Sequence, residues 1–323
     1  MSDVAPSLET NLCGVVLRNP VLAASGTFGY GIEFEKLVDL NALGGLVVKG
    51  LSREPIEGNP APRVIETEAG MINSIGLQNI GVRAFVREKL PALARFSTAV
   101  FANVFGYRTE DYVEVVRVLE DYAGLAGYEL NVSCPNTRHG GIFFSSDAAL
   151  LGEVVAAVKR VARRPLIVKL SPNVSAIEPL ARAAEENGAD AISLVNTFVA
   201  LAIDARTRRT RIGAGFGGLS GPAIKPIALR LVYQAALAVK IPVVGLGGIA
   251  NGEDAAEFLI AGARAVEVGT ATFWDPRSPL RIAEELGEFL RREKIAEVGE
   301  IVGTLEMGAK EVHHRDTETQ RKP

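Results

Sequence analysis

Eight short runs of apolar, often β-branched residues recur along this 323-residue chain, and most are followed by a stretch of helical periodicity. Strands alternating with helices in this way predict parallel β/α units. Runs that are apolar along nearly their whole length are typical of a sheet covered on both faces. Eight units favour one closed (β/α)8 barrel, the TIM barrel, over the alternative of an open doubly wound sheet. The runs are Val21–Ala23, Gly45–Lys49, Ala99–Val104, Tyr128–Ser133, Leu166–Leu170, Ala191–Asn196, Pro242–Gly247 and Ala265–Gly269.

A barrel of this kind takes about 250 residues and tolerates insertions. Residues 1–310 are therefore interpreted as one α/β barrel domain with a short N-terminal extension, although the length also allows two smaller domains. Residues 311–323 are polar and aperiodic, which predicts a flexible tail. The predicted helices are Val82–Ala94, Asp111–Tyr122, Asp147–Arg163, Ala176–Asn187, Ile224–Val239 and Glu253–Ala261.

Two connections are too long for plain β/α units. Residues 51–98 contain a Gly/Asn-rich segment, and residues 198–223 are rich in Gly and Arg. Long excursions inside a compact domain are usually functional or disordered. In a barrel both would extend from the C-terminal ends of strands, where active sites form.

Composition excludes several classes of function. The 35 basic and 38 acidic residues give a net charge of −3, which provides no electrostatic reason to bind nucleic acid or an anionic membrane. No run approaches the roughly 20 apolar residues that span a bilayer, and no signal peptide is recognisable, so we expect a cytoplasmic protein. Two cysteines and three histidines, without metal-ligand spacing, predict neither a disulfide scaffold nor a metal site.

Glycines follow the last two predicted strands, as Gly247-Gly248 and Gly269-Thr270. Loops at these positions of a barrel commonly bind phosphate, because glycines let backbone N–H groups approach and helix N-termini favour anions. Asn251 is the expected cap of the helix after the first pair, and Ser278 is the expected cap of a later helix that begins with Pro279. The alternative is that the glycines only form tight turns.

Cys134 lies where a polar strand end meets a Pro-Asn turn. Since Pro135 cannot donate to a central ladder, we expect the strand to end near Ser133 and Cys134 to lie in the loop at the barrel mouth. The rest of this loop, to residue 146, would be a mobile lid. The alternative for any cysteine is packing as a small hydrophobe, and Cys13 is interpreted in that way.

Lysines and amides complete the candidate site. Lys49 and Lys169 lie inside apolar runs, where an ammonium needs an anionic partner or a route to water. Each lysine could instead simply emerge into solvent. Amide groups recur at strand ends and in loops, and together they suit a planar ligand with alternating N–H and C=O groups, although each could be an ordinary turn residue. These residues are Asn73, Asn103, Asn131 and Asn196, with Thr197 after the last.

At the level of whole motifs, roughly residues 8–290 resemble the dihydroorotate dehydrogenase family, class 1 catalytic chain. The order of the motifs is more specific than any one of them. They are NPVLAASGTFGYG at 19–31, VVKGLS at 47–52, NSIGLQN at 73–79, ELNVSCPN at 129–136, IVKLSPN at 167–173, LVNT at 194–197, GGLSGPAIKP at 217–226, and the pair GLGGI and VGTA.

The resemblance implies FMN as a tightly bound cofactor and dihydroorotate as the substrate. Cys134 matches the family's base, which removes the proton from C5 while hydride passes from C6 to the flavin, and Lys169 would stabilise negative charge on the reduced flavin. By motif, FMN would contact Ser25, Lys49, Gly50, Asn103, Asn131, Lys169, Val195, Gly221, Gly247, Gly248, Gly269 and Thr270. The pyrimidine would contact Lys49, Asn73, Ser74, Ile75, Gly76, Leu77, Asn131, Asn196 and Thr197.

The segments GTFGYG and HGGIFF are most similar to the NAD-dependent type of class 1, called class 1B. That similarity implies a homodimer served by a partner subunit that carries FAD and an iron–sulfur cluster. Two cysteines are too few to hold such a cluster in this chain. The lid sequence departs from the commonest family pattern after Gly141.

Three other functions stay open from the residues themselves. A related flavin barrel acting on another dihydropyrimidine would share the flavin site and the cysteine but recognise no carboxylate. A phosphate-substrate isomerase or lyase would leave Lys169 without an obvious partner. A non-catalytic binding barrel is the third. Bound flavin would exclude the last two, and orotate binding would separate the first.

Overall fold

The structure, a computed structural model, describes residues 5–132, 144 and 147–308. Eight parallel strands close into a barrel in the order β10-β15-β16-β3-β4-β7-β8-β9. The predicted barrel is therefore confirmed, and each predicted apolar run supplies one strand. The strands are β3 (Val21–Ala23), β4 (Gly45–Leu51), β7 (Ala99–Val104), β8 (Gly127–Asn131), β9 (Leu166–Lys169), β10 (Ala191–Leu194), β15 (Val243–Leu246) and β16 (Ala265–Val268).

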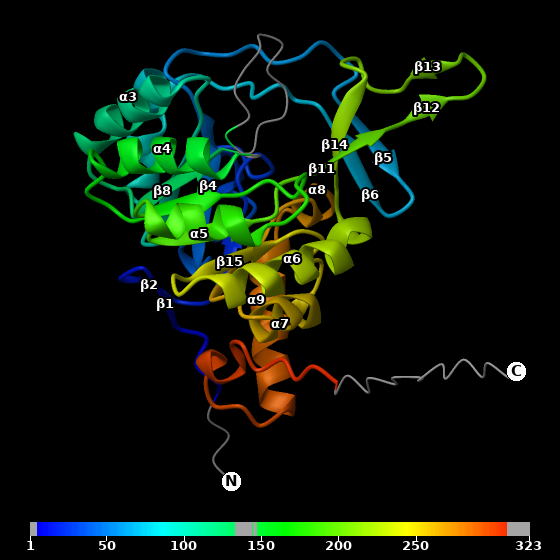
Figure 1. Cartoon of the computed structure of the whole chain (residues 1–323). Coiled ribbons are helices and arrows are strands. Elements are labelled where there is room, and N and C mark those ends of the chain that lie inside the picture. The colour runs from blue at the N-terminus through cyan, green and yellow to red at the C-terminus, as the bar shows by residue number, and fades with distance from the viewer. Residues whose placement is uncertain (1–4, 133–143, 145–146, 309–323) are drawn as a thin grey trace, which may run out of the picture.

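Helices cover the outside of the barrel, so the strands are buried on both faces (Figure 1). This burial explains the continuous apolar runs. The helices are α1 (Val82–Glu88), α2 (Leu90–Leu93), α3 (Thr109–Glu120), α4 (Ala148–Lys159), α5 (Glu178–Glu186), α6 (Lys225–Ala238), α7 (Gly252–Ile260), α8 (Ala271–Trp274) and α9 (Ser278–Arg292). The predicted helix Val82–Ala94 was wrong as one element: it divides at Lys89 into α1 and α2, because Pro91 lacks the N–H needed to continue the α1 ladder.

An N-terminal hairpin closes one end of the barrel. Strands β1 (Thr10–Leu12) and β2 (Val15–Leu17) place Leu12 and Leu17 in a small apolar cluster with residues near the N-terminal ends of the barrel strands, such as Val47 and Phe101. Both leucines are almost fully buried. The polar interior of the barrel can therefore open only toward the C-terminal ends of the strands.

The two long excursions pair with each other. From the first come β5 (Val64–Thr67) and β6 (Gly70–Asn73), and from the second β11 (Phe198–Leu201) and β14 (Phe216–Ser220). They form one sheet in the order β11-β14-β6-β5, which lies beside the barrel in Figure 1. A small hairpin, β12 (Ile203–Asp204) and β13 (Arg209–Thr210), extends beyond it. This antiparallel sheet was not predicted, since Gly217 and Gly218 interrupt the apolar pattern of β14.

No helix in the described ranges is long and apolar enough to cross a membrane. The predicted flexible tail, 311–323, lies outside the described residues, as does most of the predicted lid.

Candidate active site

A cavity of about 1070 Å³ lies at the C-terminal ends of the barrel strands. Its walls come from two sources. The ends of the barrel strands and the loops after them contribute residues such as Lys49, Asn103 and Gly247. The antiparallel sheet contributes residues such as Asn73 of β6 and Gly218 of β14. The long excursions therefore complete the mouth of the barrel.

Every predicted site residue that the structure describes lines this one cavity. They are Ser25, Lys49, Gly50, Asn73, Ser74, Ile75, Gly76, Leu77, Asn103, Asn131, Lys169, Val195, Asn196, Thr197, Gly221, Gly247, Gly248, Gly269 and Thr270. The predicted base, Cys134, lies outside the described residues. The last described residues before it, Asn131 and Val132, are both buried.

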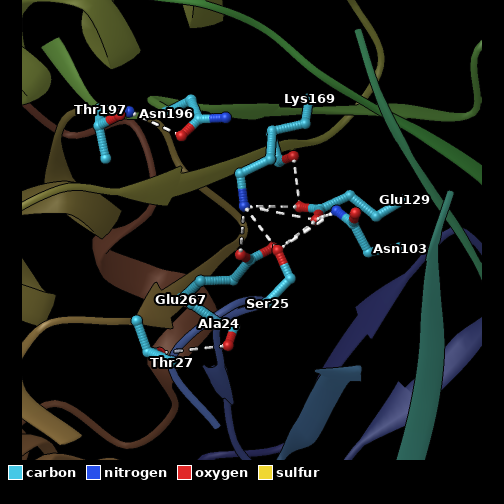
Figure 2. A network of polar contacts seen from close by, with 10 residues as sticks. Ala24, Ser25, Thr27, Asn103, Glu129, Lys169, Asn196, Thr197 and Glu267 are labelled. Carbon is cyan, nitrogen blue, oxygen red and sulfur yellow. Dashed lines mark hydrogen bonds and ion pairs between the residues drawn. The ribbon is translucent and has the colours of Figure 1, made fainter. Parts of the chain in front are cut away.

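Lys169 is held between two buried carboxylates (Figure 2). Its Nζ atom lies 3.2 Å from Oε1 of Glu129 on β8 and 3.2 Å from Oε2 of Glu267 on β16. Lys169 is 4% exposed, Glu267 1% and Glu129 0%. From the sequence, an anionic ligand or water was the expected partner of Lys169. The structure corrects this expectation, because strands on either side of the barrel interior supply two carboxylates.

Neutral donors surround Glu129. Its Oε1 accepts from Oγ of Ser193 at 2.8 Å, and its Oε2 accepts from Nδ2 of Asn103 at 2.5 Å and from Oγ of Ser25 at 3.3 Å. Burial alone raises the pKa of Glu129, but the Lys169 charge and the hydrogen bonds from Glu267, Asn103 and Ser193 outweigh it and hold the pKa below its usual value. Glu129 is therefore the ionised partner of Lys169.

Glu267 has fewer donors. Its Oε2 meets Lys169, while its Oε1 is buried without a hydrogen-bond partner among the described residues. Burial and the neighbouring charge of Glu129 raise the pKa of Glu267 to about 8. Burial lowers the pKa of Lys169, but the two carboxylates outweigh that effect and the pKa lies above its usual value. The directions of these three pKa shifts favour one ionised carboxylate, one ammonium and one carboxylic acid in the cluster.

Lys49, Asn73, Asn196 and Thr197 also line the cavity. Burial, with a smaller contribution from the Arg63 charge, lowers the pKa of Lys49. Nδ2 of Asn73 donates to the Gly218 carbonyl at 3.3 Å, which fixes its side chain across the antiparallel sheet. The backbone N–H of Thr197 donates to Oδ1 of Asn196 at 2.8 Å. These contacts orient polar groups around a common space.

The Gly247-Gly248 turn brings backbone close to the cavity. Gly248 has φ +83°, and a Cβ there would lie 2.8 Å from Cβ of Lys225 and 2.9 Å from the Gly221 carbonyl oxygen. Glycine is required at this position. The next helix, α7, begins as predicted: Oδ1 of Asn251 accepts from the Asp254 N–H at 2.8 Å.

Two other expectations concern single residues. The predicted cap at Ser278 was wrong: Arg277 precedes α9, and Oγ of Ser278 instead donates to the Ala271 carbonyl at 2.9 Å, because the residue is buried against α8.

Cys13 donates from Sγ to the Asp190 carbonyl at 3.1 Å, and burial, with the Asp190 charge, raises its pKa to about 12. Such a thiol is unreactive, in line with its interpretation as a packing residue.

Glu129 and Glu267 were not among the residues predicted from the sequence to form the site. The signal that singled out Lys169, a charged residue inside an apolar strand run, applies equally to both. The described residues hold no group of three or more His, Cys, Asp or Glu side chains suited to a metal ion.

Comparisons with known proteins agree with one another. The family model described as dihydroorotate dehydrogenase matches residues 7–290. A Solibacter usitatus protein, provisionally named dihydroorotate dehydrogenase A (fumarate), is 82% identical over 94% of this chain and 99% of its own length. The catalytic subunit named dihydroorotate dehydrogenase B (NAD(+)) from Citrifermentans bemidjiense is 50% identical over 94% of this chain and 99% of its own. Its Thermodesulfovibrio yellowstonii counterpart is 51% identical, over 93% and 99%.

Proposed function

The chain belongs to the dihydroorotate dehydrogenase family, and we propose that the cavity at the mouth of its barrel is where it oxidises dihydroorotate to orotate with bound FMN. This oxidation, a step of pyrimidine biosynthesis, is the reaction of the family, and FMN is the family's usual cofactor. One observation carries the proposal: every described residue assigned to cofactor or substrate lines the same cavity.

Three features of the cavity fit FMN. Its volume of about 1070 Å³ lies just above the roughly 300–1,000 Å³ found for small-molecule sites, so a cofactor and a substrate could share it. Gly248, in the turn before α7, lines the cavity, and the N-terminus of that helix would favour a phosphate. Oε1 of Glu267 has no partner among the described residues and needs one from a ligand.

The roles of the other residues follow from their chemistry. When bound, FMN supplies the acceptor for the hydrogen and two electrons that leave C6 of the substrate. Lys169 provides positive charge close to the ring system, and Asn103 and Asn131 provide amide donors and acceptors. Lys49 would neutralise the carboxylate of dihydroorotate. The backbone and side chains of residues 73–77, with Asn196 and Thr197, would bind the pyrimidine N–H and C=O groups.

Cys134 is the proposed general base. Its assignment rests on the ELNVSCPN motif and on its position three residues after Asn131, which ends β8 in the cavity. A thiolate within reach of C5 would remove the proton as the hydride leaves C6. Geometry comes first for such a base, and a free thiol pKa near about 8.5 needs only modest lowering to act near neutral pH.

For the electron acceptor, the GTFGYG and HGGIFF segments and the NAD-type relatives favour NAD, reached through a partner subunit carrying FAD and an iron–sulfur cluster. Fumarate is the second candidate, because the 82% identical relative is named for it. Anaerobic reoxidation of the reduced chain separates the two. Direct reoxidation by fumarate supports the second, whereas reoxidation by NAD only with an added electron-transfer subunit supports the first. A homodimer is part of the NAD-type proposal and is tested by light scattering.

The function is tested by recording the visible spectrum of the purified chain and then adding dihydroorotate without oxygen. The proposal predicts flavin absorbance that bleaches with dihydroorotate and not with dihydrouracil, which lacks the carboxylate. A yellow protein bleached equally by dihydrouracil would favour a dehydrogenase for another dihydropyrimidine. A colourless protein that takes up no added FMN would contradict the proposal.

A further inference from the structure

The buried cluster around Lys169 contains one more acid than it needs. Glu129, Lys169 and Glu267 are each at most 4% exposed, and Lys169 contacts both carboxylates at 3.2 Å. With all three groups charged, the cluster would carry a net charge of −1 away from water. An uncompensated buried charge is strongly unfavourable, so such a site binds a proton instead.

The hydrogen bonds show which carboxyl group binds that proton. Glu129 accepts from Ser193, Asn103, Ser25 and Lys169, all of which favour its ionised form. Glu267 accepts only from Lys169, at Oε2, and its Oε1 has no partner among the described residues. A protonated Glu267 donates a hydrogen bond to the Glu129 carboxylate, which also favours the proton on Glu267, and Glu267 lines the cavity in which the ligand would bind. Burial, with the charge of Glu129, raises its pKa to about 8, in agreement with this assignment.

We propose that Glu267 is a redox-linked proton site, which binds a proton when FMN is reduced and releases it at alkaline pH when FMN is oxidised. This inference rests on the proposed function, because it requires FMN in the cavity. Reduction adds two electrons and one proton to FMN and leaves a negative charge on the ring. Above the pKa of Glu267 in the oxidised protein, that charge draws a second proton from water onto the Glu267 carboxylate. With this proton bound, the Glu267 carboxyl group is neutral and adds no second negative charge beside the reduced ring.

Few other titratable groups face Glu267. The strands that flank it, β3 and β15, contain none. Across the barrel interior, β8 contributes Glu129 and β9 contributes Lys169. The other charged residues that line the described cavity are Lys49, Arg108 and Asp111. These side chains are unchanged in a Glu267→Gln variant, so that variant isolates the contribution of Glu267.

The test is the midpoint potential of FMN in the full chain, measured against reference dyes from about two pH units below to two above the pKa of Glu267. For a two-electron couple, each proton taken up changes the potential by about 30 mV per pH unit. The wild type should therefore show about 30 mV per unit below pH 8 and about 60 mV above it. Glu267→Gln should show about 30 mV throughout, with a potential that departs from the wild type only at high pH.

Glu253→Gln is the matched control, because Glu253 is an exposed glutamate on α7 that pairs with Arg292. It should reproduce the wild-type slopes. The inference would be overturned if the midpoint potential of the wild type showed no steeper pH dependence above pH 8. It would also be overturned if Glu267→Gln still showed that steeper dependence.

Infrared difference spectra of the wild type test the same inference if Glu267→Gln binds no FMN. Reduction above pH 8 should produce a new carboxylic acid C=O band, and reduction well below pH 8 should not. No such band at high pH would overturn the inference. These measurements use a chemical reductant, so they are independent of the substrate. If FMN binds but does not bleach with dihydroorotate, only the proposed function is contradicted. If the chain does not bind FMN, both the proposed function and the proton site at Glu267 are contradicted.

Discussion

The ammonium of Lys169 on β9 lies 3.2 Å from Oε1 of Glu129 on the neighbouring strand β8, and both side chains are almost completely buried inside the barrel. Parallel pairing sets this contact, because Asn131 of β8 lies opposite Lys169 in the register and Glu129 lies two residues earlier on the same side of the strand. The pair thus fixes the ammonium at the base of the cavity.

Replacing Lys169 by Met should lower both stability and flavin reduction. The change leaves Glu129 buried without its cation, and breaking a buried ion pair typically costs about 3–5 kcal/mol. Denaturant unfolding measures the loss. FMN reduction by dihydroorotate should also slow, since the positive charge near the ring is gone. A Lys169→Met protein with wild-type stability and reduction rate would show that the ion pair has neither role.

Glu120→Gln should destabilise the chain by about 1–2 kcal/mol at neutral pH. Glu120, at the end of α3, accepts from the Arg163 N–H at 2.7 Å and from Nη1 of Arg164 at 3.0 Å. Burial raises the pKa of Glu120, but the hydrogen bonds from Arg163 and Tyr128 and the Arg164 charge outweigh it and hold the pKa below its usual value.

Because the folded pKa of Glu120 is lowered, its stabilisation is fully present above the unfolded value and is lost as pH falls through the folded pKa. The stability difference between wild type and Glu120→Gln should therefore shrink below about pH 4.5. Glu114→Gln on the same helix is the control. Glu114 has one ion pair, with the exposed Arg83, so its replacement should cost less than about 1 kcal/mol. Equal losses in the two variants would contradict this account.

Gly248→Ala should weaken FMN binding, measured by fluorescence as FMN is taken up by the apoprotein. The new Cβ would meet Cβ of Lys225 at 2.8 Å and the Gly221 carbonyl oxygen at 2.9 Å, so the turn beside α7 must shift. Gly215→Ala is the matched control, since Gly215 also has a positive φ of +89° but nothing within 4 Å of the added atom. Both variants bear the backbone strain, so only Gly248→Ala should lose affinity.

Asn251→Ala should lower stability by about 1 kcal/mol through loss of the α7 cap, as measured by thermal unfolding. Asn251→Asp retains an oxygen that accepts from the Asp254 N–H, and should restore most of the loss. If both variants lose the same amount, the cap is not the cause.

The barrel was predictable because both faces of its strands are covered, which leaves continuous apolar runs in the sequence. The antiparallel sheet was not predictable, because its strands pair residues that are far apart in the sequence, such as Asn73 and Gly218. No local periodicity in the sequence indicates such a pairing. Some residues that line the cavity, such as Lys169 and Gly247, were predicted from their own position and type, and others, such as Ile75, only through whole motifs. The buried acids Glu129 and Glu267 were missed although the signal that marked Lys169, a charged residue inside an apolar strand run, applies to both.

The most direct test of the central claim is the rate at which dihydroorotate bleaches bound FMN in Cys134→Ala and the wild type, followed anaerobically by stopped flow. A general base contributes about 10²–10⁴-fold, so the variant should bind FMN normally and bleach slower by that factor. Cys13→Ala, which changes the half-buried cysteine outside the cavity, should bleach at the wild-type rate. A Cys134→Ala chain that bleaches as fast as the wild type would contradict the assignment of Cys134 as the base.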